Sequence, residues 1–111
     1  MGKFQAPPEE APMKPTRTPR RQFIIEAIDQ MTLISVDYDR HHVIVAPHIY
    51  GVDDQGEEML HGWVVPDPLG RWTTEILSEA RIVQPINQRF AGPHIGYSKS
   101  NSRFAEIFAA L

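Results

Sequence analysis

The chain has 111 residues, 41% of them hydrophobic and 23% charged, which suffices for one domain with one modest core. Its net charge of −3 excludes the strongly basic composition of histone-like and ribosomal proteins. Because it contains no cysteine, disulfides, iron–sulfur clusters, thiolate catalysis and cysteine-ligated zinc are also excluded. The lack of cysteine fits a reducing compartment, and we expect a cytoplasmic location.

The first 21 residues differ in composition from residues 22–111. They hold five of the ten prolines and carry a net charge of +3, whereas the rest of the chain carries −6. The segment has too few apolar side chains to offset the entropy cost of ordering its backbone. We therefore expect a disordered, basic, proline-rich tail. It lacks the continuous apolar core of a secretory signal, and no apolar run in the chain is long enough to span a membrane. A solvated leader is the simplest interpretation, although Arg17, Arg20 and Arg21 could contact phosphate.

The body opens with a helical pattern and then changes period. Apolar residues at spacings of three and four predict a short helix over Gln22–Met31. The β-rich segment Leu33–Tyr38 predicts a strand, and Asp39-Arg40 supplies a tight reversal. A continuous apolar strand follows at His42–Ala46, and we expect Pro47 to end it.

A hairpin and several shorter elements complete the expected domain. The turn at Val52–Glu57 returns the chain into a strand over Met59–Val65. Pro66–Gly70 predicts another turn, and Trp72–Leu77 and Arg81–Val83 predict short extended segments. Helical spacing of the last apolar residues predicts a helix over 101–111, suited to covering an open sheet edge. These elements predict an α+β domain over residues 22–111: a strongly curved antiparallel sheet or partly open barrel with an N-terminal and a C-terminal helix.

The five histidines are the main chemical resource of the body. If the hairpin is centred on Asp54-Gln55, His48 and His61 face each other across it, followed along the same face by Ala46 and Trp63. Two imidazoles at that separation could share a metal ion, but zinc needs three or four ligands and the sequence places no third one. We therefore expect a polar pair at a sheet end rather than a metal site.

Other candidate sites are weaker than the histidines. The acidic turn at 53–58 has carboxylate oxygens for calcium but lacks the ligand pattern of an EF-hand loop, so a solvated hairpin tip is expected. No nucleophile elbow or phosphate-cradling glycine loop is present, so nothing argues for an enzyme. Trp63 and Trp72, with Tyr38 nearby, could form a stacking platform for bases, although core packing of such rings is the commoner outcome.

Several short motifs, in order along the chain, carry a resemblance to a known family. They are the helix start Ile24–Ile28, the strand Leu33–Tyr38 ending in tyrosine, the segment Pro47–Gly51, the turn at Asp53, Gly56 and Glu57, and the closing segment Phe90–Tyr97. Trp72 stands eighteen residues before Phe90, a separation associated with the same family. Over residues 22–111 the chain thus resembles the small stand-alone WYL domain that lacks a helix-turn-helix. The resemblance implies an Sm-like or SH3-like barrel that acts as a sensor, binding nucleic-acid or nucleotide-type ligands and regulating a partner.

The chain departs from that family mainly where arginines are expected. The namesake Trp-Tyr-Leu is here Trp63-Val64-Val65, Val43 stands where an arginine is expected, and His94 replaces the closing arginine. In the later strand, where the family tends to have Phe-Arg and Asp-Arg pairs, this chain has Glu75-Ile76 and Ser78-Glu79. Arginine suits phosphate sites because it is always charged and grips two oxygens at once. A body with a charge of −6 repels polyanions, so the expectation of a barrel is stronger than that of its usual ligand.

These observations lead to one functional expectation and two alternatives. We expect a non-enzymatic regulatory module, without cofactor or metal, that binds a small or nucleotide-type ligand or a protein partner. Its expected site comprises Tyr38, His42, His48, Trp63, Arg81 and His94. The first alternative is a single-stranded nucleic-acid-binding protein that uses Arg17, Arg20 and Arg21 with the barrel aromatics. The second is an oligomeric scaffold subunit that associates through open barrel edges and the terminal helix, whose apolar side comprises Phe104, Ile107, Phe108 and Leu111.

Overall fold

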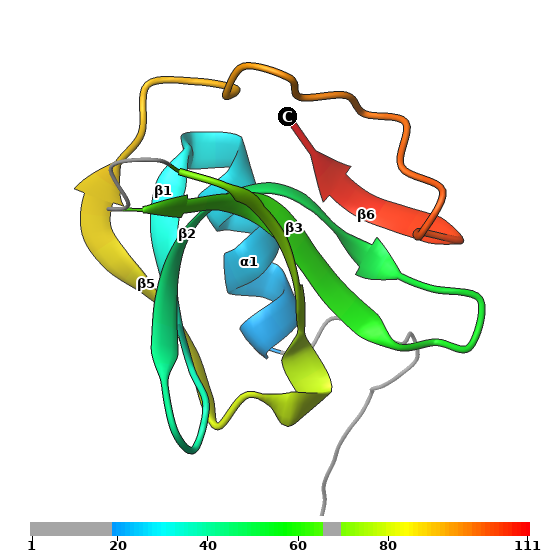
Figure 1. Cartoon of the computed structure of the whole chain (residues 1–111), viewed down its shortest axis with the longest axis horizontal. Coiled ribbons are helices and arrows are strands. Elements are labelled where there is room, and N and C mark those ends of the chain that lie inside the picture. The colour runs from blue at the N-terminus through cyan, green and yellow to red at the C-terminus, as the bar shows by residue number, and fades with distance from the viewer. Residues whose placement is uncertain (1–18, 66–69) are drawn as a thin grey trace, which may run out of the picture.

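One helix and one antiparallel sheet make up the part of the chain that the computed structural model describes, residues 19–65 and 70–111 (Figure 1). The elements in chain order are α1 (Pro19–Gln30), β1 (Thr32–Asp37), β2 (His42–Val52), β3 (Glu58–Val65), β4 (Trp72–Ile76), the 3₁₀ turn η2 (Leu77–Glu79), β5 (Ile82–Arg89) and β6 (Glu106–Ala110). The α+β class, the N-terminal helix and the hairpin of β2 and β3 are confirmed. The turn expected at Pro66–Gly70 lies largely outside the described residues.

The helix α1 packs one face onto the sheet, as its apolar spacing predicts. It begins at Pro19, three residues before the expected start, and proline suits the first turn because its missing N–H would have no partner there. Ile24, Ala27 and Ile28 are its buried residues. Met31, with a φ of 57°, then turns the chain directly into β1. The helix therefore lies against the strand that follows it.

The long strand β2 is the centre of the sheet. One of its edges pairs with β3, while the other pairs first with β1, up to Val45, and then with β6, from Ile49 onward. Pro47 lies between these two partners, where its missing N–H breaks no ladder, so the expectation that Pro47 ends the strand is wrong. The register with β3 shifts at the same place, between Pro47 and Ile49. His48 therefore stands in a β-bulge, and bulges re-aim side chains.

The sheet is curved but not closed into a barrel. Its order is β4-β3-β2-β1-β5, with β6 beside β2, and β4 and β5 are the outer strands. Only residues 77–81 connect these outer strands, although four strand spacings in a flat sheet would separate them by about 19 Å. The sheet therefore curves around α1, as Figure 1 shows. The partly open barrel is thus corrected to an open six-stranded sheet.

The C-terminal helix expected over residues 101–111 is wrong, because this segment forms the strand β6. Helical spacing placed Ile107 on the buried face, yet its side chain is 41% exposed, whereas Phe108 packs against Tyr50. The second half of β2 has backbone groups that need partners, and β6 supplies them from Ile49 to Val52. A segment this short gains more from pairing with that edge than from an isolated helical turn.

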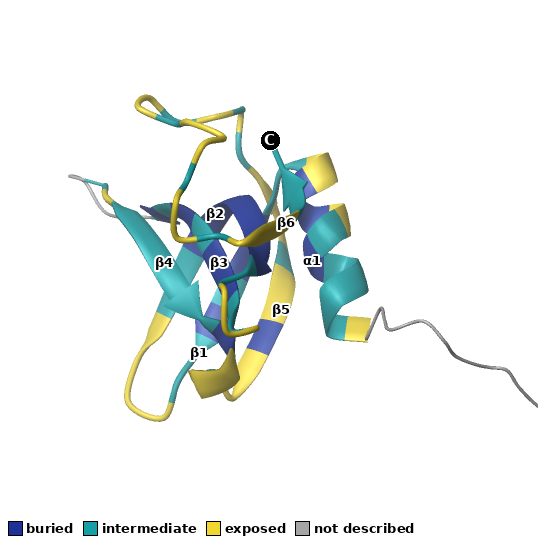
Figure 2. Cartoon of the chain, turned by 90° about the vertical axis from the view of Figure 1, so that its right-hand side faces the viewer, coloured by how far each residue is buried: buried dark blue, intermediate teal, exposed yellow. Residues whose placement is uncertain are grey.

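The apolar core lies between α1 and the concave face of the sheet (Figure 2). It joins the buried helix residues to side chains from five further elements: Ile34 and Val36 of β1, Tyr50 of β2, Leu60 of β3, Leu77 of η2 and Val83 of β5. Each large aliphatic side chain buried there contributes about 1.5–3 kcal/mol. Among the described residues, no helix has the length and apolar character needed to cross a membrane.

Candidate functional site

Seven aromatic and imidazole rings gather where β2, β3 and β4 meet the segment after β5, and we call them the ring cluster. Its members are His48, His61, Trp63, Trp72, Phe90, His94 and Tyr97. Centroids of neighbouring rings are 4.9–6.2 Å apart, within the range of favourable aromatic contacts. Three of its members were expected site residues: His48, Trp63 and His94.

Pairing between β3 and β4 fixes the centre of the ring cluster. Trp63 and Trp72 are cross-strand partners, and their rings meet at 84° with centroids 5.2 Å apart. His61 lies two positions away on the same face of β3 and stacks on Trp72 at 5.1 Å and 5°. Its Nδ1 lies 2.9 Å from the hydroxyl of Thr74, its partner on β4. The alternation of strand side chains thus brings three rings to one face.

The segment after β5 adds a second stacked pair. His94 lies over Trp63 at 5.0 Å and 13°, and Tyr97 lies 6.2 Å from Trp72. Gly70, with a φ of 62°, packs so closely on the Trp63 indole that a Cβ there would lie 2.2 Å from it. His61, Trp63, Trp72 and His94 are each only partly buried. The cluster therefore contains two stacked pairs, His61 on Trp72 and His94 on Trp63. The pairs meet at nearly a right angle, and their rings remain partly accessible to solvent.

His48 lies behind these rings and is fully buried. Its Nδ1 is 2.7 Å from the carbonyl oxygen of Ala46, and its Nε2 accepts a hydrogen bond of 3.0 Å from the backbone N–H of His94. A carbonyl only accepts and an amide N–H only donates, so the proton of His48 is on Nδ1. His48 is thus neutral, with both ring nitrogens in hydrogen bonds.

The histidines of the ring cluster are uncharged at neutral pH. Burial lowers the pKa of His48, and the neighbouring imidazoles of His94 and His61 lower it further. Burial also lowers the pKa of His61, with a further contribution from the positive charge of Arg103, and burial alone lowers that of His94. The rings therefore act as neutral stacking surfaces, and Arg103 supplies a positive charge beside them.

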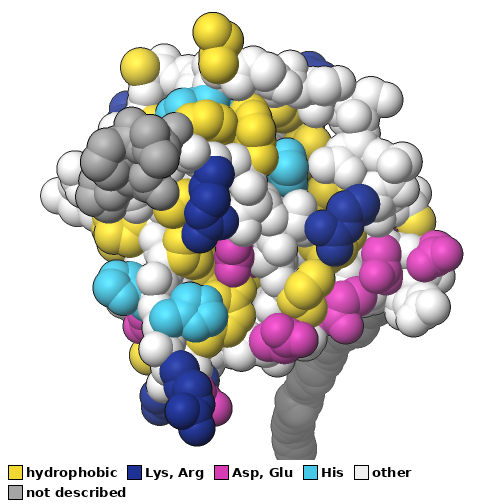
Figure 3. Space-filling view, viewed as in Figure 1, with side chains coloured by type: hydrophobic (Ala, Val, Ile, Leu, Met, Phe, Trp, Pro, Cys, Tyr) yellow, Lys and Arg dark blue, Asp and Glu magenta, His cyan; other side chains and the backbone are white. Residues whose placement is uncertain are grey.

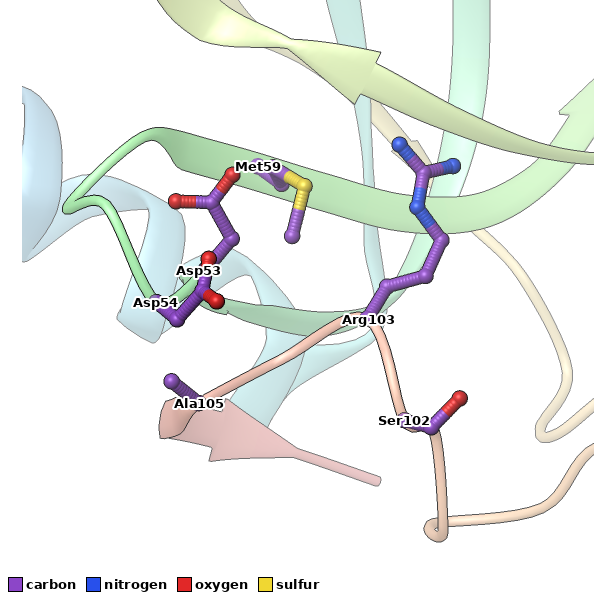
Figure 4. Close-up of a pocket in the computed structure, with 6 residues that line it drawn as sticks. All are labelled: Asp53, Asp54, Met59, Ser102, Arg103 and Ala105. Carbon is purple, nitrogen blue, oxygen red and sulfur yellow. The ribbon is translucent and has the colours of Figure 1, made fainter.

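Arg103 extends from the segment before β6 into a hollow of about 310 Å³ (Figure 4). Asp53, Asp54 and Met59 line the same hollow, but the two carboxylates lie on the other side of Met59 from the guanidinium. Among the described residues, Arg103 forms no ion pair. On the face shown in Figure 3, histidine and hydrophobic side chains adjoin, with basic side chains on either side. The charge of Arg103 is thus available at the rim of the ring cluster.

The other three expected site residues lie at the opposite end of the sheet. Arg81 and Phe90 flank β5, whose length separates them by roughly 25–30 Å. Arg81 lies 3.6 Å from Asp39 in an exposed ion pair. Tyr38 donates a hydrogen bond to Glu75, and burial together with this bond raises the pKa of Tyr38. The ring of Tyr38 stacks on His41. His42 lines a shallow groove beside them. The expected site is thus divided between two ends of the sheet.

The arginines at the end of the tail fall in different places. Arg17 lies outside the described residues. Arg20 donates a hydrogen bond of 3.2 Å to the carbonyl oxygen of Leu77, and Arg21 lies 3.6 Å from Glu58 and 4.2 Å from the ring of Phe108. Arg20 and Arg21 therefore belong to α1 and tie the helix to the sheet.

The structure also shows where the residues considered as metal ligands lie. The bulge at His48 makes Ile49, not His48, the partner of His61, so the direct histidine pair is wrong, although Ala46 and Trp63 do pair. Within the described part of the chain, no group of three metal-ligating side chains exists. At the acidic turn, Asp53 accepts backbone hydrogen bonds from Gln55 and Glu57 and so shapes the hairpin tip.

Sequence reasoning missed part of the ring cluster. Phe90 and Tyr97 were noted only as the ends of the closing segment Phe90–Tyr97, and their place beside His48 depends on a contact between positions 46 residues apart. Arg103 gave no signal, because it fell in the expected helix. A wrong element assignment thus hid the basic residue whose charge acts on His61.

Comparison of the chain with protein-family models, with curated proteins and with solved structures finds no match.

Proposed function

We propose that this protein is a non-enzymatic regulatory module whose ring cluster binds a planar aromatic ligand that carries negative charge, such as a nucleotide. The observation that carries the proposal is the two stacked pairs, His61 on Trp72 and His94 on Trp63, which lie side by side and partly exposed. A planar ligand gains about 1–3 kcal/mol per stacked base on such a surface. Such stacking tolerates any base, because every base has an aromatic face.

The electrostatics of the ring cluster support an anionic rather than a cationic ligand. Neutral histidines stack without the cost of desolvating a charge, and Arg103 offers a cation at the rim. The resemblance to WYL domains supports the same ligand class. In this chain His94 occupies the place of the family's closing arginine, so stacking takes the larger share of binding.

The non-enzymatic assignment rests on how the buried histidine is used. His48 has both ring nitrogens in hydrogen bonds to backbone groups, so it has no free nitrogen with which to take a proton from a substrate. The rings around it offer surface rather than a nucleophile. We therefore propose that ligand binding is transmitted to a protein partner, as in a sensor.

Tryptophan fluorescence tests the proposal directly, because both tryptophans of the chain are in the ring cluster. Adenosine monophosphate should quench this fluorescence saturably, adenosine should bind more weakly, and ribose 5-phosphate should bind least. Arg103→Ala should lower the affinity for the nucleotide and leave the affinity for adenosine unchanged. His42→Ala, at the far end of the sheet, is the matched control and should change neither. The proposal fails if nucleotide and ribose 5-phosphate bind equally, or if neither nucleotide nor nucleoside quenches at millimolar concentration.

Single-stranded nucleic acid remains an alternative occupant of the same rings. An oligonucleotide that binds far more tightly than the mononucleotide, with steep salt dependence, would favour it. Removal of residues 1–18 should then abolish binding, because Arg20 and Arg21 are engaged within the fold.

A scaffold subunit is the other alternative, for which exposed Ile82 and Ile107 on β5 and β6 offer contact surface. Light scattering that shows a monomer at high concentration would exclude it.

A further inference from the structure

His48 is the buried polar residue of the described core, and it connects two parts of the chain that are distant in sequence. It projects from the bulge in β2, and its Nε2 holds the backbone of His94 in the segment after β5. Its ring also contacts Phe90 and Tyr97, at the two ends of that segment, and Trp72 of β4. His48 thus touches both walls of the ring cluster.

The hydrogen bond from His94 requires one protonation state of His48. Nδ1 donates to Ala46, and only an Nε2 without a proton can accept from the His94 N–H. A second proton on Nε2 would set two donors against each other at 3.0 Å. Nδ1 of His94 is buried without a partner among the described residues, so its ring is held by stacking on Trp63. The backbone of His94 is held by His48 and by the hydrogen bond that its carbonyl accepts from the Tyr97 N–H.

We propose that His48 is a positioning residue: in its neutral form it holds residues 90–97 against β3 and β4, and its protonation releases them and dismantles the ligand site. Neutral solution therefore assembles the ring cluster and acid opens it. The release itself does not depend on the proposed function. Only its effect on nucleotide binding rests on that function.

One group around His48 favours its charged form, the Ala46 carbonyl that accepts from Nδ1, and burial outweighs it. The titratable groups that face His48 are His61 from β3 and His94 and Tyr97 from the segment after β5. Trp72 of β4 and Phe90 do not titrate, and from the end of β6 the backbone N–H of Leu111 donates to the carbonyl of His48. No side-chain carboxylate is among these contacts, and an oxygen of the last residue, Leu111, accepts a hydrogen bond from the Tyr97 hydroxyl. Burial and the neighbouring imidazoles lower the pKa of His48, so the opening occurs below the ordinary histidine value of about 6.5.

Two substitutions separate positioning from packing. His48→Gln can place an amide oxygen near the position of Nε2 and cannot titrate, so it should hold His94 at all pH values. His48→Phe keeps a ring of similar size but has no acceptor, so it should release the segment even at neutral pH. His94→Gln keeps the backbone N–H and removes the titration of His94 itself, and it should open in acid as the wild type does.

The experiment measures opening without any ligand. Nitrogen-15 NMR of the imidazoles should show His48 as the neutral Nδ1–H form at pH 7. Hydrogen exchange of the His94 amide, corrected for intrinsic rates, should accelerate at least about tenfold as His48 becomes protonated, the loss expected for one hydrogen bond. His48→Gln should abolish this acceleration, and His48→Phe should show it already at pH 7.

Three results would overturn the proposal. They are an Nε2–H form of His48 at pH 7, an acid opening retained in His48→Gln, and an acid opening lost in His94→Gln. If the amide opens as expected but no nucleotide binds at pH 7, the proposed function fails and the positioning role stands. If nucleotide binds equally well at pH 7 and after His48 is protonated, the positioning role fails and the proposed function stands.

Discussion

The α1-facing core and the ring cluster are held together by different forces, although both involve β2 and β3. The core is mostly aliphatic: Ile24 and Ile28 of α1 meet Ile34 of β1 and Leu60 of β3. The ring cluster contains two tryptophans and three histidines, one of which, His48, is fully buried and depends on two hydrogen bonds. Aliphatic packing loses little with pH, whereas a buried neutral histidine is stable only while it remains unprotonated.

This contrast indicates a division of labour within a small domain. A chain of this size has only a few kilocalories of net stability, and the core supplies most of its favourable free energy. The ring cluster adds partly exposed surface and an unsatisfied ring nitrogen on His94, features that cost stability. Regions that pay such a cost are where binding is expected, because a ligand can recover part of it.

The largest expected effect comes from the core. Ile34→Ala removes a fully buried side chain that packs between the sheet and α1, and it should lower the free energy of unfolding by about 2–5 kcal/mol. Urea denaturation followed by circular dichroism measures this loss. Ile95→Ala is the control: its side chain is 90% exposed, so it should change stability by at most about 0.5 kcal/mol. Equal effects of the two substitutions would contradict the placement of the core.

A smaller effect is expected from Gly70, which belongs to the ring cluster. Gly70→Ala should cost about 1–3 kcal/mol, because the residue has a positive φ and the new Cβ would meet the Trp63 indole. Since the clash is local, the tryptophan emission spectrum should change while the helical signal of α1 persists. Gly56→Ala also has a positive φ but meets nothing within 4 Å, so it should leave the emission unchanged.

Acid should weaken the ring cluster before the core. His48, His61 and His94 all have a lowered pKa, so in acid the unfolded chain binds more protons than the folded one. The free energy of unfolding should therefore fall as pH drops below about 6.5, the ordinary histidine value. His48→Gln should flatten this dependence, whereas His42→Gln should not, because His42 is exposed. A stability that is constant from pH 7 to pH 5 would contradict the neutral state of these histidines.

Local sequence patterns predicted the fold best where an element is self-contained. The apolar spacing around Ile24 and Ile28 predicted α1, and the β2–β3 hairpin followed from a turn between two apolar runs. The prediction failed for the last apolar residues, because their helical spacing gave no information on the edge of β2 with which β6 pairs. Tertiary pairing decided that segment, and no local pattern reveals it.

The candidate site was predictable only in part for a similar reason. His48, Trp63 and His94 were expected together and are together, but the bulge at His48 follows from the switch of partners along β2. A period-two pattern assumes an unbroken register, so a single inserted residue misplaced the His48–His61 pair. Tyr38, His42 and Arg81 were grouped with them, although β5 separates Arg81 from the ring cluster and His42 lines a different groove.

Arg81 provides the smallest expected effect. Its ion pair with Asp39 joins side chains that are 66% and 84% exposed, so solvent screens it, and Arg81→Ala should lower stability by at most about 0.5 kcal/mol. Because β5 separates Arg81 from the ring cluster, nucleotide affinity should also stay unchanged, whereas Arg103→Ala should reduce it. Titration of both variants with adenosine monophosphate, followed by tryptophan fluorescence, measures this difference. A loss of affinity in Arg81→Ala that Arg103→Ala does not share would move the ligand to the opposite end of the sheet, where Arg81, Tyr38 and His42 lie.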